Sequence, residues 1–127
     1  MEPSKHSKDD VVLDRKVALG QLDGDVDTLA MLLDLFRADA PNTLEAIRKA
    51  VRENSANGLR SAAHKFKGSL SALGAGYAMK AALTLETIGR TGAMAEAQAA
   101  LAILEQEVVR LEPELADFSK ELRSSQH

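Results

Sequence analysis

The feature that most constrains the fold is a run of apolar side chains near the C-terminus, spaced in alternating steps of three and four residues. Its members are Met94, Ala97, Leu101, Leu104, Val108, Leu111, Leu115, Phe118 and Leu122. This spacing places them along one face of an α-helix and is typical of a helix packed nearly parallel or antiparallel to its neighbours. The segment from Ala93 onward is therefore predicted to be a long amphipathic helix, which Pro113 kinks or restarts.

A second apolar stripe with helical spacing runs through the first half of the chain. Its members are Val26, Leu29, Leu33, Phe36, Ala40, Leu44, Ile47 and Val51. The stripe continues through Pro41, although proline removes one backbone hydrogen bond from a helix. We therefore expect one long kinked helix after Gly24-Asp25 rather than two helices, followed by a turn over residues 54–58.

The other predicted helices are shorter, and a glycine ends or follows each of them. They cover residues 15–19, with Asp14 as cap and Gly20 as stop, about 57–73, stopping at Gly74, and about 75–91, followed by Gly92. Four substantial amphipathic helices with short connections predict an all-α fold. We expect an up-and-down antiparallel four-helix bundle with a short extra N-terminal helix.

The chain has 127 residues, which is the length of one domain. We expect a flexible lead-in over residues 1–10, the bundle over 11–123 and a tail over 124–127; His6 and His127 lie in these ends and are interpreted as bystanders. The hydrophobic content of 45% comes mostly from alanine and leucine, which favour helices over strands.

Composition also excludes several classes of function. The absence of cysteine excludes disulfides, thiolate metal sites and a cysteine nucleophile. A net charge of −3 and an aromatic content of 3% argue against nucleic-acid binding, which needs basic surfaces and stacking platforms. No apolar run approaches the ~20 residues of a membrane span, and no signal peptide is visible. We therefore expect a cytoplasmic domain without membrane contact.

His64, on the third predicted helix, is the only histidine outside the two ends. At about 100° per residue, the core side of this helix holds Leu59, Ala62, Ala63, Phe66, Ser69, Leu70 and Leu73. The residues within roughly 60° of His64, on the other side, are Asn57, Arg60, Ser61, Lys67, Gly68 and Ser71. His64 is therefore predicted to point outward, either as an ordinary surface histidine or as a functional one.

Two neighbours favour the functional interpretation. Gly68 lies one turn beyond His64 in the middle of a helix, where glycine costs ~1 kcal/mol relative to alanine. Without a side chain, Gly68 leaves room beside the imidazole for a phosphoryl group and an incoming partner. Lys67 places an ammonium near the same point, where it could offset phosphate charge.

Glu86, on the fourth predicted helix, continues an otherwise apolar stripe of Ala75, Met79 and Ala82. A carboxylate at such a position needs a partner. One candidate is a ring N–H of His64, which would fix the tautomer and leave the other nitrogen free as a nucleophile. The other candidate is Arg90, four residues further along the same helix. Both remain open.

The segment Ala63-His64-Lys65-Phe66-Lys67-Gly68, followed after five residues by Gly74-Ala75, resembles the signature of the histidine-containing phosphotransfer (HPt) domain family. Phe66 stands where that family usually has leucine. The flanks are also similar, with Leu22-Asp23-Gly24-Asp25 before a long helix that contains Phe36, and Leu85-Glu86 on the helix after the site. The resemblance covers roughly residues 12–111.

This resemblance implies the role of a phosphocarrier. His64 would accept a phosphoryl group from an aspartyl phosphate on a receiver domain and pass it to an aspartate of a response regulator. Lys67 would assist electrostatically, Gly68 would keep the ring accessible, and Glu86 would orient the imidazole. Magnesium would belong to the receiver, so we expect no metal or other cofactor on this chain. No Gly-rich phosphate loop or ATP motif is present, so no kinase activity is expected.

We expect receiver domains, of a hybrid sensor kinase or of a response regulator, to dock around His64 as transient partners of a monomer. Arg60, Ser61, Lys65 and Ser71 would form the rim of that contact. The chain could be free-standing or a segment of a hybrid sensor histidine kinase. The alternative function is a helical interaction module in which His64 is incidental. A metal- or haem-binding bundle would need several inward-facing ligands, which the sequence does not offer.

Overall fold

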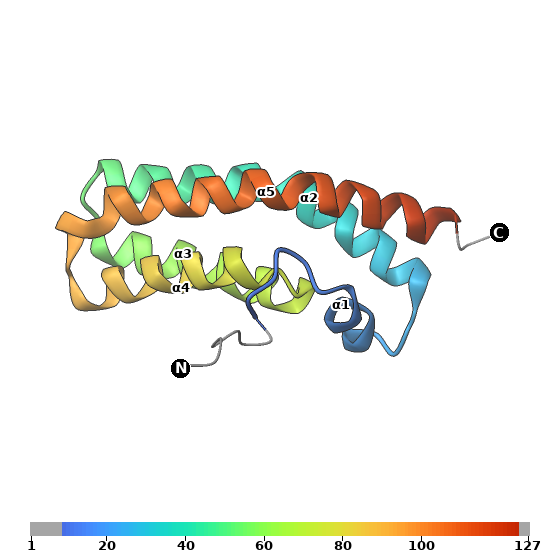
Figure 1. Cartoon of the computed structure of the whole chain (residues 1–127). Coiled ribbons are helices and arrows are strands. Elements are labelled where there is room, and N and C mark those ends of the chain that lie inside the picture. The colour runs from blue at the N-terminus through green and yellow to red at the C-terminus, as the bar shows by residue number, and fades with distance from the viewer. Residues whose placement is uncertain (1–8, 125–127) are drawn as a thin grey trace, which may run out of the picture.

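The computed structural model describes residues 9–124, and within them every regular element is a helix (Figure 1). In chain order the elements are α1 (Arg15–Gln21), α2 (Val26–Arg52), α3 (Ala56–Leu73), α4 (Gly76–Thr91), the short 3₁₀ helix η1 (Met94–Glu96) and α5 (Ala97–Ser124). The predicted all-α fold is confirmed.

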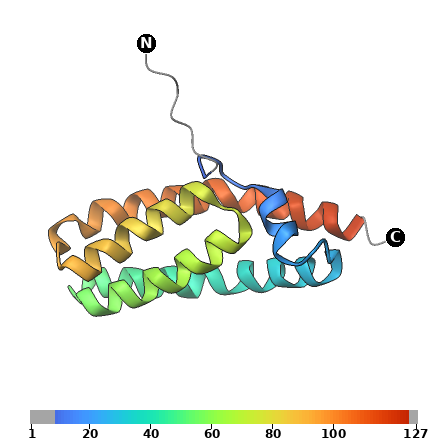
Figure 2. The ribbon, with the colours of Figure 1, turned by 90° about the horizontal axis from the view of Figure 1, so that it is seen from below.

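The four long helices form an antiparallel bundle. α2 and α5 lie side by side along their length, and the shorter pair α3 and α4 packs against one half of them (Figure 1). Each helix of the bundle contacts the next in the order α2, α3, α4, α5, and α5 returns to α2. α1 occupies the other half, beyond the α3–α4 connection, where it contacts α2 and α3 (Figure 2). The predicted four-helix bundle with a short N-terminal helix is therefore confirmed.

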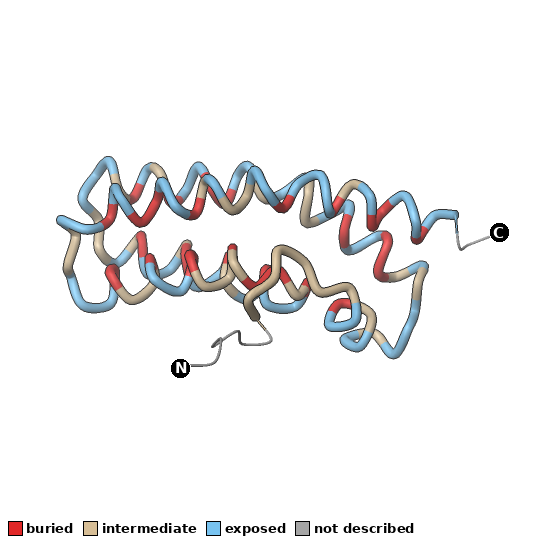
Figure 3. Tube along the Cα trace, viewed as in Figure 1, coloured by how far each residue is buried: buried red, intermediate tan, exposed pale blue. Residues whose placement is uncertain are grey.

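The core lies along the inward faces of these helices (Figure 3). Its largest fully buried side chains are Phe66, Leu33, Ile47, Leu59, Leu70, Leu85, Leu104, Leu111 and Leu115. Burying an aliphatic or aromatic side chain of this size stabilises a fold by about 1.5–3 kcal/mol. Phe66 stacks on Phe36 with ring centroids 5.9 Å apart, so the ring anchors α3 to α2 directly behind His64.

Both internal prolines lie within unbroken helices. α2 passes through Pro41 as one helix, as predicted, and α5 passes through Pro113 without restarting. A proline at position i leaves the carbonyl of residue i−4 without its helical partner. For Pro113 that residue is Val109, which is 73% exposed and so lies on the solvent side of α5. The helix therefore tolerates the proline.

One predicted boundary is wrong by two residues, and another differs by a single residue. Gly20 lies within α1 and does not end it, because the turn that follows uses left-handed backbone at Asp23 (φ 52°) and Gly24 (φ 79°) instead. α3 begins at Ala56, inside the predicted turn, because Ser55 caps it by accepting a hydrogen bond from the backbone N–H of Gly58 at 3.1 Å.

The segment before α1 packs on the start of α4. The Tyr77 backbone N–H donates to the Val11 carbonyl at 2.9 Å, and Lys80 pairs with Asp10. A Cβ on Gly76 would lie 1.8 Å from the Asp9 carbonyl oxygen, so only glycine permits this approach. Two residues assigned to the lead-in therefore already contact the bundle.

Ser124, assigned to the tail, is the last residue of α5. The predictions for residues 1–8, including His6, and for residues 125–127, including His127, lie outside the described residues. Among the described helices, none is long and apolar enough to cross a membrane.

Candidate functional site

The candidate site lies on the outer face of α3, which is fixed at both ends. Ser55 caps its start, and Gly74 in left-handed conformation (φ 76°) ends it. The inward face of α3 is buried through Leu59, Ala63, Phe66, Leu70 and Leu73. The His64 side chain points the other way and is 65% exposed. A rigid, core-anchored helix thus presents an accessible imidazole.

Glu86 of α4 is the group that holds this imidazole. Its Oε2 lies 2.8 Å from Nδ1 of His64. The Glu86 side chain is only 16% exposed, so the carboxylate lies largely sheltered against α3. Of the two partners that the sequence left open, the structure places His64 in contact with Glu86, and no ion pair joins Glu86 to Arg90 within residues 9–124.

Gly89, one turn after Glu86, permits the close approach of α4 to α3. A Cβ at this position would lie 2.5 Å from the backbone nitrogen of Arg60 and 2.7 Å from the carbonyl oxygen of Ala56. Any side chain would therefore push the two backbones apart. The contact between His64 and Glu86 depends on this spacing, because both residues are fixed on their helices.

Lys67 contacts the other oxygen of the same carboxylate. Its Nζ lies 2.7 Å from Glu86 Oε1, as an ion pair outside hydrogen-bond geometry, and Oε1 is itself buried from solvent. The neighbouring Lys67 ammonium and the hydrogen bond to His64 lower the pKa of Glu86, and burial only partly opposes them. Glu86 is therefore ionised at neutral pH.

An ionised carboxylate can only accept hydrogen bonds, so Nδ1 of His64 must be the donor. In a neutral imidazole the other nitrogen, Nε2, then carries the free lone pair. The arrangement thus selects one tautomer and leaves Nε2 as the ring atom that could act as a nucleophile.

Gly68 lies in open space on the exposed side of α3. A Cβ built at Gly68 meets nothing within 4 Å, so close packing does not explain the glycine. Mid-helix glycine costs about 1 kcal/mol relative to alanine. What the glycine provides is room beside His64, one turn away.

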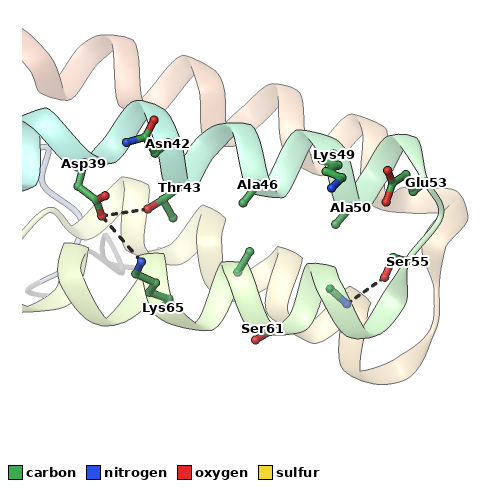
Figure 4. Close-up of a pocket in the computed structure, with 12 residues that line it drawn as sticks. Asp39, Asn42, Thr43, Ala46, Lys49, Ala50, Glu53, Ser55, Ser61 and Lys65 are labelled. Carbon is green, nitrogen blue, oxygen red and sulfur yellow. Dashed lines mark hydrogen bonds and ion pairs between the residues drawn. The ribbon is translucent and has the colours of Figure 1, made fainter.

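The predicted rim residues are all exposed, but they do not form one cluster. Ser61 and Lys65 line a groove of about 570 Å³ between α2 and α3 (Figure 4). Arg60 donates a hydrogen bond to Asn57 at 2.9 Å. Ser71 lines a separate hollow near the start of α4. From Arg60 to Ser71 the helix rises roughly 16 Å, so the rim would have to extend along most of α3.

α2 lines one side of the groove in Figure 4, from Ala50 to Asp39. The Lys65 ammonium lies 3.9 Å from Oδ2 of Asp39, which also accepts a hydrogen bond from Thr43 at 3.3 Å. Asp39 therefore links the two helices beside His64.

A second groove, of about 520 Å³, begins on the other side of Asp39 and is mainly apolar. α2 contributes Leu32 and Leu35, which are 43% and 59% exposed, and α3 contributes Ser69 and Ala72. Assigning Ser69 to the core side was wrong, because it lies at the edge of the buried face and is exposed to this groove. Together with Lys65 and Ser61, these residues form what we call the α2–α3 face.

Sequence reasoning missed the leucines of this face. The available signal was their register: Leu32 and Leu35 lie outside the stripe of Leu29, Leu33 and Phe36, so a regular helix must turn them toward solvent. Within residues 9–124, no group of three or more histidine or carboxylate side chains is placed to hold a metal ion.

The chain matches one protein family model and is similar to a solved structure. The family model described as "Hpt domain" matches residues 31–120, which include α3, most of α2 and all of α4. The crystal structure of histidine-containing phosphotransfer protein B (HptB) from Pseudomonas aeruginosa PAO1 is similar, with a TM-score of 0.81 and 27% sequence identity over 88% of this chain and 97% of that one. No curated protein gives a significant match.

Proposed function

This chain belongs to the Hpt domain family and is a histidine phosphocarrier of a phosphorelay, and we propose that His64 is the residue that carries the phosphoryl group. The observation that carries this assignment is the contact between Glu86 and Nδ1 of His64 on an otherwise exposed imidazole. It leaves Nε2 as the free nucleophile at the surface, where another protein's aspartyl phosphate can reach it.

In this proposal each neighbour of His64 has a separate task. Glu86 fixes the ring orientation and the tautomer. Lys67, within reach of the same space, stabilises negative charge on the phosphoryl group as it transfers. Gly68 keeps the approach to the ring open.

Hpt domains interact with receiver domains in phosphorelays, and we assign the α2–α3 face as the docking surface for them on this chain. Its apolar groove lies beside the acceptor, and leucines half exposed to water gain from being covered. The basic groups Arg60 and Lys65 would complement the acidic pocket around a receiver aspartate. Ser61 would add a small polar contact on this face, and Ser71, which lines the separate hollow near the start of α4, would add another only if the contact extends along α3.

The chain acts as a carrier and not as a kinase. We propose that it works as a monomer in the cytoplasm, has no ATP site, and binds no cofactor of its own. Magnesium in this scheme is held by the receiver partner. The same role is compatible with a free-standing protein and with a domain of a hybrid sensor histidine kinase. An interaction module in which His64 is incidental is not favoured, since the matched family carries out phosphotransfer.

The test is direct transfer of label. Several receiver domains are loaded with labelled acetyl phosphate, separated from the excess reagent and mixed with this protein. We expect acid-labile, base-stable label on the wild type and none on His64→Gln, whose fold is checked by circular dichroism. Label that persists on His64→Gln would refute the assignment of the acceptor. The absence of label on a folded wild type with every receiver tried would refute the phosphocarrier role.

A further inference from the structure

The carboxylate of Glu86 contacts two groups, the imidazole of His64 through Oε2 and the ammonium of Lys67 through Oε1. We propose that the negative charge of Glu86 serves the donating half of the relay, by keeping the phosphorylated ring of His64 protonated at Nδ1. Before phosphorylation the Lys67 ammonium pairs with this carboxylate, and afterwards it turns away from the carboxylate toward the phosphoryl group. The inference rests on the proposed function and goes beyond orientation of the ring.

The accepting step requires no proton transfer. The Nε2 lone pair of neutral His64 attacks the phosphorus of an aspartyl phosphate, and a P–N bond forms. The P–O bond to the acyl oxygen breaks, and its electron pair leaves with the receiver's carboxylate. The proton on Nδ1 stays in place, so the product ring is a phosphoimidazolium with one positive charge, 2.8 Å from the Glu86 oxygen.

The donating step reverses these changes. A carboxylate oxygen of the second receiver attacks phosphorus, the P–N bond breaks, and its electron pair returns to Nε2. If Nδ1 has kept its proton, the leaving group is a neutral imidazole. If that proton has been lost, the leaving group is an imidazolate, a far stronger base that leaves much more slowly. The charge of Glu86 therefore decides whether the stored group can be passed on.

The position of Lys67 makes this charge responsive. Before phosphorylation its ammonium neutralises Oε1, which weakens the pull of the carboxylate on His64. A phosphoryl group on Nε2 brings negative charge within one helical turn of Lys67, on the side left open by Gly68. The Lys67 side chain is 26% exposed and long enough to turn toward that group. Glu86 then faces the phosphoimidazolium without a competing cation.

Other charged groups near the site are separated from the ring. On α3, Lys65 pairs with Asp39 of α2, and Arg60 bonds to Asn57. On α4, Arg90 is exposed and forms no ion pair within residues 9–124. Of the described side chains, only Glu86 makes a polar contact with His64. A change in the protonation of phosphorylated His64 can therefore be traced to Glu86.

The test compares Glu86→Gln with the wild type as full chains. A glutamine oxygen can still accept from Nδ1–H, so orientation is retained while the charge is lost. Each protein is loaded chemically with phosphoramidate, which does not depend on a receiver. The loss of phosphoryl group to water and to an unphosphorylated receiver is then followed between pH 5 and 9. Glu114→Gln removes an exposed carboxylate on α5 as the matched control.

As the pH rises, the rate of transfer to the receiver should decrease in every protein. In Glu86→Gln this decrease should occur at a pH about one unit or more below that of the wild type and of Glu114→Gln. At pH 8 the onward transfer of Glu86→Gln should be about tenfold slower. Lys67→Gln, which keeps the carboxylate, should leave the position of the profile unchanged.

Three results would overturn the inference. Coincident profiles for the wild type and Glu86→Gln would show that the charge is not used. A shift in Lys67→Gln equal to that in Glu86→Gln would assign the effect to the lysine instead. A wild type that takes label neither from phosphoramidate nor from any receiver would refute the proposed function, and this inference with it. If Glu86→Gln does not fold, the transfer rate of Glu86→Asp is measured over the same pH range. Because Glu86→Asp keeps the negative charge, its rate should decrease within about half a pH unit of the wild type.

Discussion

Oε2 of Glu86 lies 2.8 Å from Nδ1 of His64, and this contact connects α4 to the exposed side of α3. The His64 imidazole is therefore oriented from a neighbouring helix rather than from its own. Since Phe66 of α3 and Leu85 of α4 are both buried in the core, the geometry of the imidazole depends on packing beneath the surface.

Gly68→Ala is predicted to stabilise the protein while impairing transfer. Because a Cβ at Gly68 meets nothing within 4 Å, the helix gains about 1 kcal/mol without strain. The added methyl group narrows the approach to His64, so phosphotransfer from a receiver should slow at least about tenfold. Thermal unfolding and single-turnover transfer are the two measurements.

Gly20→Ala is the matched control, since Gly20 also lies inside a helix with nothing within 4 Å. It should stabilise the protein and leave transfer unchanged. A Gly68→Ala protein that transfers as fast as Gly20→Ala would show that the open space is not used.

Gly89→Ala is predicted to damage both stability and transfer. Its Cβ would lie 2.5 Å from a backbone atom of α3, so the two helices must separate, at a cost of about 1–3 kcal/mol. This separation lengthens the contact between Glu86 and His64. Denaturant unfolding should show the loss of stability, and ¹⁵N spectra of the imidazole should show a mixture of tautomers. A single tautomer with unchanged stability would contradict the spacing argument.

Leu35→Glu is predicted to weaken docking without unfolding the protein. Leu35 is 59% exposed on the α2–α3 face, so its replacement costs little in the free domain. A buried carboxylate in the complex should raise the receiver concentration needed for half-maximal transfer about tenfold. Val109→Glu, at a 73% exposed site on α5, is the control and should behave as the wild type. Equal effects of the two changes would place docking elsewhere.

Glu86→Gln is predicted to make stability less sensitive to acid. The folded protein holds the pKa of Glu86 below its ordinary value, chiefly through Lys67, so the ionised carboxylate favours folding at neutral pH. That contribution is complete above the usual glutamate value of about 4.3 and is lost as the pH falls through the lower folded value. Urea midpoints at pH 7 and pH 3 should therefore differ more in the wild type than in Glu86→Gln. An identical acid dependence would mean that the carboxylate contributes nothing to folding.

Most of the fold was predictable because the spacing of apolar residues, which determines the buried face of each helix, can be read directly from the sequence. The stripe through Pro41 was enough to predict one helix, and the outward direction of His64 followed from its position opposite the apolar side of its helix. The end of α1 was not predictable from Gly20, because Asp23 takes a left-handed conformation that few residues other than glycine adopt.

The partner of Glu86 could not be decided from sequence for a different reason. Both Arg90 and His64 were within chemical reach, and the choice depends on how closely α3 and α4 approach each other. That distance is set by Gly89, whose role only the packed structure reveals. The exposed leucines of α2 were visible as residues out of register, but the groove they form with α3 needs both helices in place.

The position of His64 on the middle of a regular helix has a consequence for how long the signal lasts. Within residues 9–124 the ring is 65% exposed, and the residues around it belong to the packed helices α3 and α4 rather than to a loop that could cover it. If His64 carries the phosphoryl group as proposed, that group would be open to water between encounters, and a docked partner would shield it. The lifetime of phosphorylated His64 would then depend on two things: the rate at which the phosphoimidazole is hydrolysed, and the concentration of partner domains.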